Sequence, residues 1–214
     1  MQIEELSQRL TERENPVRVH LIGDNTINAF VAGGQRMFIN TGLILKTDYP
    51  GEVIGVIAHE AGHIAGGHLA RMQRQLEKAS TAAIIGMLVG AAAIVGGAAA
   101  GQRDAAQVGQ GIVSANPEIV RRGVLSYQRA QEAAADQAAV SYLERTGQSS
   151  KGMMTLFQKL ANDALVSLRY ADPYVLSHPM PRNRISLLER TATKSKYFDI
   201  FNNFFAWKKL VKIR

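Results

Sequence analysis

Val53-Ile54-Gly55-Val56-Ile57-Ala58-His59-Glu60-Ala61-Gly62-His63 is the stretch that decides the fold. Two histidines four residues apart on an α-helix lie one turn apart on the same face, so both rings can bind one tetrahedral Zn²⁺ at about 2.0–2.1 Å. Glu60 lies beside them and can take a proton from a metal-bound water without itself being a ligand. Such a motif also occurs by chance in helical proteins that bind no metal. The preceding apolar run predicts a buried helix, however, and buried histidines and glutamates are usually paired or metal-bound.

His68 is a third histidine in the same predicted helix, which we expect to run from Pro50 to about Lys78. It follows His63 by five residues, which places it about 140° further around the helix. We therefore predict that His68 packs on another face and binds no metal. His20, in a predicted strand, is expected to be a partly buried structural histidine.

A catalytic zinc needs a third protein ligand and an open fourth position. Glu132 is the candidate, because it lies in an Ala-rich turn of a long helix predicted from Pro117 to about Arg145. Small neighbours would let this helix approach the zinc helix closely. Asp136 lies one turn later on the same face and could accept a hydrogen bond from a ligand histidine. The alternative is that both are simply exposed helix acids.

The segments around these helices predict a mainly helical α+β domain. Residues 17–22, 27–32 and 36–40 alternate like strands, and Gly33-Gly34 is typical of a two-residue hairpin. We expect a small, mostly antiparallel β-meander against the zinc-binding helix. Further helices are predicted over about 3–13, 41–45 and 151–167, the last with a core-like apolar stripe.

Composition bounds the possible functions. The 214 residues suit one domain, and the absence of cysteine excludes disulfides, thiolate ligands and a cysteine nucleophile. The net charge of +7 is concentrated in residues 151–214, which hold 12 basic and 4 acidic side chains. Such a tail can favour an anionic membrane surface, or it can be a solvated helical face. No nucleic-acid-binding motif accompanies it, and the opening residues lack the form of a signal peptide.

Residues 81–101 form an uncharged, Ala- and Gly-rich run that is long enough to span a bilayer. Alanine and glycine contribute little transfer free energy, so we favour a buried or membrane-touching helical hairpin over a true span. Residues 102–116 are expected to form a polar, mobile connection that could act as a lid. Residues 197–214, aromatic and then basic, could be an interfacial amphipathic helix or the stub of a longer protein.

The segment 172–185 holds three prolines, which predict a stiff, extended loop. His178 and two arginines lie in it. A stiff loop with a titratable ring is a good place for a site residue, although His-Pro alone is a weak signal.

Four motifs in order resemble metallopeptidase family 48, the gluzincins that include HtpX and the CAAX-prenyl endopeptidases. They are Asn28-Ala29-Phe30 with the Gly33-Gly34 hairpin, His59-Glu60-Ala61-Gly62-His63, Glu132-Ala-Ala-Ala-Asp136, and Ser177-His178-Pro179 followed by Arg184-Ile185. The similarity covers about residues 5–195 and is nearest to the BepA-like periplasmic branch. Members of that branch often carry a C-terminal tetratricopeptide repeat domain, which this chain, ending at Arg214, does not show.

The resemblance implies a gluzincin domain over residues 1–195, followed by a tail over 196–214. It implies zinc held by His59, His63 and Glu132, with Glu60 as general base. His178 matches a loop histidine that can take the fourth zinc position and keep the enzyme latent, and Arg184 matches an arginine that helps to bind substrate. The branch is exported to the periplasm and acts in outer-membrane protein quality control.

The resulting hypothesis is a zinc metalloendopeptidase that cuts unfolded or misassembled proteins. A substrate would add as an extended strand beside Asn28, Ala29 and Phe30, through main-chain bonds that do not depend on its sequence. His178 or Arg184 is the candidate donor to the oxyanion of the tetrahedral intermediate. Two alternatives stay open: a zinc-stabilised, chaperone-like binding module with little proteolysis, and a membrane-integral protease with residues 81–101 as a span.

Overall fold

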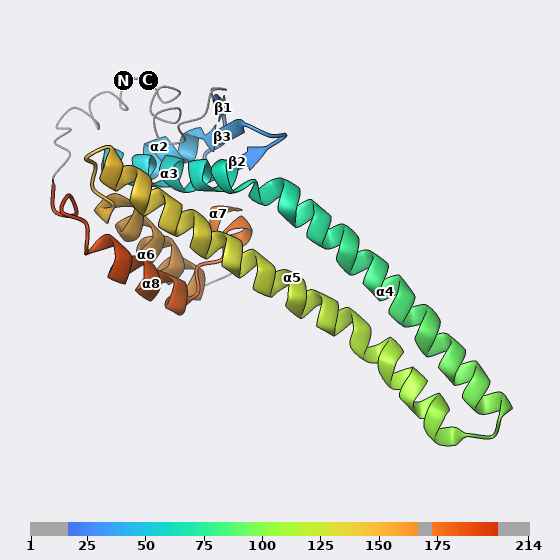
Figure 1. Ribbon diagram of the computed structural model, residues 1–214. Helices are drawn as coiled ribbons and strands as arrows, with labels where there is room; N and C mark the ends of the chain where they lie inside the picture. The colour runs from blue at the N-terminus through green and yellow to red at the C-terminus, as the bar shows by residue number, and fades with distance from the viewer. Residues whose placement is uncertain (1–16, 167–172, 201–214) are drawn as a thin grey trace. The chain divides into compact units, whose positions relative to one another are not determined.

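The computed structural model describes residues 17–166 and 173–200 of the chain. Three strands and seven helices follow one another in these residues (Figure 1). The elements are β1 (Arg18–Ile22), β2 (Ala29–Ala32), β3 (Arg36–Asn40), α2 (Thr41–Lys46), α3 (Pro50–Gly66), α4 (His68–Ala99), α5 (Arg103–Arg145), α6 (Lys151–Val166), α7 (Pro173–Ser177) and α8 (Arg182–Ala192). This confirms the mainly helical α+β class. The helix predicted over 3–13 and the tail from 201 on lie outside the described residues.

The chain divides into two units: the residues up to 69 together with those from 131 on, and residues 70–130. The first unit holds the sheet, α3 and the core. Its largest fully buried side chains include Ile57, Leu143, Leu156, Phe157 and Leu188.

The sheet is mixed and does not form the predicted meander. Its strand order is β1-β3-β2, with β1 parallel and β2 antiparallel to β3. The loop between β1 and β2 explains the difference. The Asp24 side chain accepts a hydrogen bond from the Thr26 amide, and the Asp24 carbonyl accepts one from the amide of Gly42 at the start of α2. The loop is thereby held against α2, so β1 lies beside β3 instead of turning back on β2.

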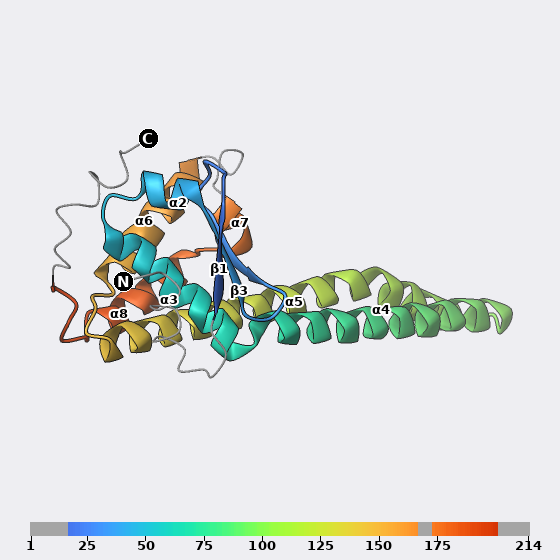
Figure 2. The ribbon, with the colours of Figure 1, turned by 90° about the horizontal axis from the view of Figure 1, so that it is seen from above.

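Helix α3 carries the two histidines through the middle of the first unit, between the sheet and α6 (Figure 2). Pro50 stands in its first turn, and the Glu52 carboxylate accepts a hydrogen bond from the Asp48 amide at 2.7 Å. Glycine lets α3 and α6 approach closely: a Cβ at Gly55 would lie 2.6 Å from the Cα of Met153. This packing buries α3 almost completely, as its apolar sequence predicted.

Helix α3 ends earlier than its sequence pattern predicted. Gly67 adopts a left-handed conformation with φ 60°, and its amide donates to the carbonyl of Ile64. This is a glycine C-cap, because a side chain at this φ would be strained. The helix is thus interrupted at Gly67, and α4 begins at His68, so the angular argument that placed His68 on another face does not apply.

In the second unit, α4 and α5 run side by side as an antiparallel pair (Figures 1 and 2). Glycines let their backbones touch, since a Cβ at Gly109 would lie 2.6 Å from the carbonyl oxygen of Gly90. Gly101, with φ 68°, forms the turn between them. The helical hairpin expected within residues 81–101 is not found there, because α4 continues to Ala99 and pairs with α5 instead. Two further predictions were wrong: residues 103–116 are helical rather than a loose connection, and α5 begins at Arg103 rather than at Pro117.

Candidate metal centre

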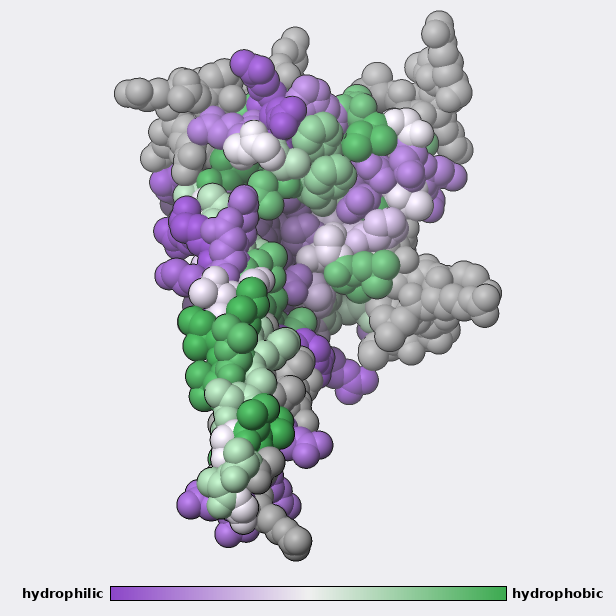
Figure 3. Space-filling model, turned by 90° about the vertical axis from the view of Figure 1, so that its right-hand side faces the viewer, coloured by the Kyte–Doolittle hydropathy of each residue, from purple (hydrophilic) through white to green (hydrophobic). Residues whose placement is uncertain are grey.

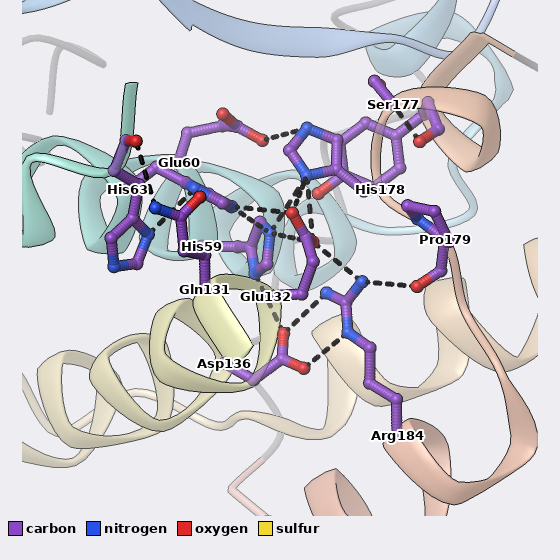
Figure 4. Close-up of polar contacts among 12 residues, drawn as sticks. His59, Glu60, His63, Gln131, Glu132, Asp136, Ser177, His178, Pro179 and Arg184 are labelled. Carbon is purple, nitrogen blue, oxygen red and sulfur yellow. Dashed lines mark hydrogen bonds and ion pairs between the residues drawn. The ribbon is translucent and has the colours of Figure 1, made fainter. Parts of the chain in front are cut away.

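Helix α3 places His59, Glu60 and His63 together in the interior, as the spacing of the motif predicted. The exposed fraction of each residue is 7% or less. The Nε2 atoms of His59 and His63 are 3.0 Å apart, so both rings point to one place (Figure 4). Two imidazole nitrogens that face each other at this distance are suited to share a proton or a metal ion.

Helix α5 brings Glu132 to the same place. Its carboxylate oxygens lie 3.4 Å from the Nε2 atoms of His59 and His63. The approach of the two helices depends on a glycine, since a Cβ at Gly62 would lie 2.8 Å from the carbonyl oxygen of Ala135. The Ala-rich turn of α5 therefore lies directly against α3, as its small side chains predicted.

His178, the residue that follows α7, is the next side chain of the cluster. Its Nδ1 lies 3.1 Å from Glu132 Oε2 and 3.4 Å from His59 Nε2, and its Nε2 lies 3.4 Å from Glu60 Oε1. The ring stacks on Tyr174 with centroids 4.6 Å apart. Part of the segment predicted as an extended loop is helical, because α7 covers Pro173–Ser177. This short helix holds Tyr174 under the histidine ring.

The four donors fit a tetrahedral zinc. One ligand atom from each of His59, His63, Glu132 and His178 can be chosen so that all lie within 4.8 Å of one another. Ligand atoms around zinc with bonds of about 2.0–2.1 Å are separated by about 3.3 Å. The contacts of His59 Nε2 with His63, Glu132 Oε2 and His178, at 3.0–3.4 Å, match this separation, while His63 contacts the other oxygen of Glu132. Nitrogen and carboxylate oxygen donors are also the ligand types that zinc takes in proteins without thiolates.

The electrostatics of the cluster agree with this donor set. Burial lowers the pKa of His63 to about 3, so its ring is neutral, which is the form that binds a metal. Burial alone would raise the pKa of Glu132, but hydrogen bonds with His178, His59 and His63 hold it well below its usual range. Burial likewise lowers the pKa of His59, and hydrogen bonds with Asp136 and Glu132 outweigh it and raise that pKa to about 9. A metal ion would therefore displace a proton from His59.

Asp136 lies behind His59, one turn after Glu132 on α5. Its Oδ1 is 2.9 Å from His59 Nδ1, the nitrogen that points away from the other ligands. A carboxylate in this position orients the ring and favours the tautomer that leaves Nε2 free for a metal.

Arg184 of α8 supports this arrangement from the other side and is 7% exposed. Its Nε and Nη2 donate to the two carboxylate oxygens of Asp136 at 2.7 and 2.9 Å. Its Nη1 donates to the carbonyl of Pro179 at 3.0 Å and lies 2.8 Å from Glu132 Oε2. The guanidinium thus joins two acids of α5 to the segment after His178. Its predicted contact with substrate stays a prediction.

Glu60 differs from the other acid of the cluster in having few polar partners. It is fully buried, and its Oε1 lies 3.4 Å from His178 Nε2, with the Tyr174 hydroxyl as its other polar neighbour. Burial raises the pKa of this carboxyl above its usual range. A carboxylate that is poorly solvated and next to the metal ligands is a stronger base than one in water, as a general base requires.

His68 lies closer to the cluster than predicted, and Gln131 and Tyr174 were not predicted as neighbours of it. His68 is buried, and its Nδ1 lies 3.0 Å from His63 Nδ1, so it faces the outer nitrogen of that ring. The Gln131 side chain donates to the His68 carbonyl at 3.1 Å. The Gly66-Gly67 pair is the sequence signal that could have predicted the position of His68, because glycine often ends a helix and His68 follows directly. Tyr174 carried no motif. The prediction of a partly buried His20 was wrong, because His20 is exposed on β1, where it stacks on Phe38.

The predicted substrate strand is an edge strand in the structure. β2 pairs only with β3 in the described sheet, and Asn28 precedes it. The Asn28 carbonyl accepts a hydrogen bond from the Asn40 amide at 3.0 Å, and Ala29 is fully buried. The carbonyl of Ile27 accepts one from the Tyr174 amide at 3.4 Å, which ties the start of β2 to α7. The strand therefore lies near the donors with one edge unpaired.

Comparison with known proteins agrees with the motif pattern. Residues 1–192 match peptidase family M48. The beta-barrel assembly-enhancing protease of Yersinia pestis is 27% identical over 201 residues, which cover 91% of this chain and 39% of that protein. The protein of the same name from Escherichia coli strain K12 is 27% identical over 188 residues, or 86% of this chain and 37% of that protein. The chain thus spans about two fifths of the length of these relatives.

Proposed function

The chain belongs to peptidase family M48, and we propose that it is a zinc-dependent metalloendopeptidase of the bacterial cell envelope that cuts unfolded or misassembled proteins. The observation that carries the proposal is the convergence of four donors from α3, α5 and the end of α7, with Glu60 beside them. The names of the relatives support a role in the assembly of outer-membrane β-barrels and thus action in the periplasm.

Glu60 is the proposed general base. The zinc, when bound, would polarise the scissile carbonyl and make water more acidic. Glu60 would take the proton of the attacking water and pass it to the leaving amine. Asp136 would hold His59 in the ligand tautomer, and Arg184 would hold Asp136. Arg184 is poorly suited to donate to the oxyanion, because its Nε, Nη1 and Nη2 atoms already contact protein acceptors. His178 is either the oxyanion donor or the latch described next, and the cleavage experiment below separates the two roles.

His178 is the proposed latch. Its ring lies within 3.4 Å of both Glu60 and Glu132, where a water and a substrate carbonyl would need room. The described form of the site is therefore closed, and substrate entry requires this ring to move. The short helix α7 and the stacking on Tyr174 hold the His178 ring in place, so a modest rearrangement of α7 would release the ring.

The proposed substrate binds as a strand on the free edge of β2. Pairing through main-chain amides and carbonyls favours extended segments of any sequence, which are available in unfolded proteins and hidden in folded ones. This accounts for a protease that would act on misassembled proteins without a strict sequence preference.

The second candidate is a zinc-stabilised, chaperone-like binding module with little proteolysis. It is favoured by the same observation that defines the latch, since His178 as a permanent fourth ligand would leave no open position. The first candidate ranks higher because Glu60 is fully buried beside the donors, which is where a general base for an attacking water would have to lie.

Cleavage of casein by the wild-type protein and by His178→Ala separates the two candidates, with zinc content measured on the same samples. The latch predicts faster cleavage by His178→Ala, and Ser177→Ala, an exposed neighbour, should behave like the wild type. Slower cleavage by His178→Ala would instead make His178 part of the catalytic machinery. Absence of cleavage in both proteins with zinc bound would favour the binding module.

Glu60→Gln provides the matched blank. It should lower cleavage by about 10²–10⁴-fold while zinc stays bound, because the amide keeps the shape of the side chain and loses only its basicity. Loss of zinc from this variant would contradict the assignment of Glu60 as a non-ligand.

A further inference from the structure

The second unit exposes an unusually apolar helix. Between Lys78 and Arg103 the chain carries no charged residue, and α4 covers most of this stretch. Its large apolar side chains project into solvent, with exposed fractions of 59% for Ile84, 65% for Leu88 and 69% for Val95. Figure 3 shows a continuous patch of hydrophobic residues along the helical pair of the second unit, with hydrophilic residues at both ends of the patch. The helix is long and apolar enough to cross a membrane.

The apolar surface extends around most of the exposed side of α4. Successive residues of an α-helix are rotated by about 100°, which places Ile84, Leu88 and Val95 within about 40° of one another. Val89 lies about 140° from Ile84 in one direction around the helix, and Met87 lies about 60° from Ile84 in the other. The exposed apolar arc is therefore about 200° wide. A helix that packs on a protein surface needs an apolar stripe of about 100°. The extra width matches a surrounding apolar medium better than a single protein groove.

Positive charge flanks the apolar segment. Residues 70–130 contain seven basic residues (Arg71, Arg74, Lys78, Arg103, Arg121, Arg122 and Arg129) and three acidic ones (Glu77, Asp104 and Glu118). Three of the basic side chains precede the apolar segment on α4 within two turns and are exposed. Basic side chains next to an apolar surface complement the anionic head groups of a bilayer.

Polar residues on α5 limit how deeply the helical pair could insert into a bilayer. On α5, Gln107 and Gln110 are exposed beside the apolar part of α4. Arg103 and Asp104 start that helix. Carrying these groups across the hydrocarbon region would be costly, because they would lose their water.

From these observations we propose that residues 70–130 insert into the surface of an anionic lipid bilayer. The apolar arc of α4 lies among the upper acyl chains, the basic residues lie at the head groups, and α5 faces water. The inserted hairpin would hold the chain at a membrane, independently of any activity at the metal centre.

Site-specific labelling tests the proposal cleanly, because the chain contains no cysteine. Leu88→Cys carries an environment-sensitive fluorophore in the apolar arc. Leu21→Cys is the matched control, because Leu21 is 59% exposed on β1 in the other unit. Vesicles of phosphatidylcholine with phosphatidylglycerol should shift the emission of the label at position 88 to the blue, and nitroxide lipids with shallow labels should quench it. The label at position 21 should respond to neither.

Flotation with the same vesicles measures the binding itself. The double variant Ile84→Asp/Leu88→Asp should bind at least about ten-fold more weakly, because both side chains are already exposed and the change affects only the inserted surface. Leu21→Asp should bind like the wild type. Pure phosphatidylcholine vesicles or high salt should weaken wild-type binding several-fold.

Three results would overturn the proposal. The label at position 88 could fail to respond to any vesicle, or both labels could respond equally. The label at position 88 could also become protected without vesicles as protein concentration rises, which would make α4 an interface between copies of the chain. Zinc binding by Ile84→Asp/Leu88→Asp, measured on the same sample, should stay normal and shows that the first unit is intact.

Discussion

Replacement of Arg184 by methionine tests whether the buried arginine is a structural support of the metal centre. Methionine keeps an unbranched aliphatic side chain and removes the guanidinium with its charge and its donors. The variant leaves Asp136 buried with no guanidinium against its two oxygens, and it leaves Glu132 without its contact at 2.8 Å. Removing one partner of a buried ion pair typically costs about 3–5 kcal/mol, because the remaining charge is uncompensated.

We expect Arg184→Met to lower the free energy of unfolding by about 3–5 kcal/mol. Arg184→Lys keeps the charge and loses the paired geometry, so its loss should be smaller, about 1.5–3 kcal/mol. Arg182→Met in the same helix is the control, because Arg182 is exposed and its loss should change stability by less than about 0.5 kcal/mol. Urea unfolding followed by circular dichroism, with a chelator present throughout, measures all three variants.

The effect of Arg184→Met should depend on pH in a definite direction. Burial alone would raise the pKa of Asp136, but hydrogen bonds from Arg184 and His59 hold it below the ordinary value of 3.8. A carboxyl with a lowered pKa in the folded state contributes stability above its unfolded pKa and loses it as pH falls. The difference between wild type and variant should therefore be full near neutral pH and shrink below about pH 4. A loss no larger than that of Arg182→Met, or one independent of pH, would refute the structural role.

Gly55→Ala should destabilise the protein by about 1–3 kcal/mol, because the new Cβ would lie 2.6 Å from the Cα of Met153 and must push two packed helices apart. Gly123→Ala, at a helical position with nothing within 4 Å, should instead stabilise α5 by up to about 1 kcal/mol, and equal effects of the two changes in urea unfolding would contradict the packing argument. His68→Leu should weaken zinc binding about 10–100-fold, because it removes the partner of His63 Nδ1 at 3.0 Å. Competition with a chelating dye checks this prediction, and an unchanged affinity would mean that His68 only packs.

Local features of the site were predictable because they depend on spacing within single helices. The positions of His59 and His63 on one face follow from the period of 3.6 residues. The pairing of Glu132 and Asp136 follows from the same period, and the Ala-rich turn around them correctly predicted a close approach to α3. The structure places all four where this reasoning expected them.

Features that depend on where the chain changes direction were not predictable in the same way. One glycine, Gly67, turns His68 back toward His63, although the pattern of apolar residues continues across it. The predicted start of α5 was also wrong, because Pro117 suits the first turn of a helix but this helix begins at Arg103. Local patterns predict the type of an element well and its ends poorly, because capping competes with propagation over only a few residues.

The sequence by itself determined which helices carry the donors, which face of each helix they share, and that α4 holds an uncharged apolar segment. These properties arise from the period of the helix and from side-chain chemistry, both of which are local. Only the tertiary structure decided that β1 pairs with β3, that His178 reaches the donors of α3 and α5, and that Arg184 joins Asp136 to Glu132. These contacts join residues far apart in the chain, and long-range packing selects them from many alternatives that local preferences leave equally favourable.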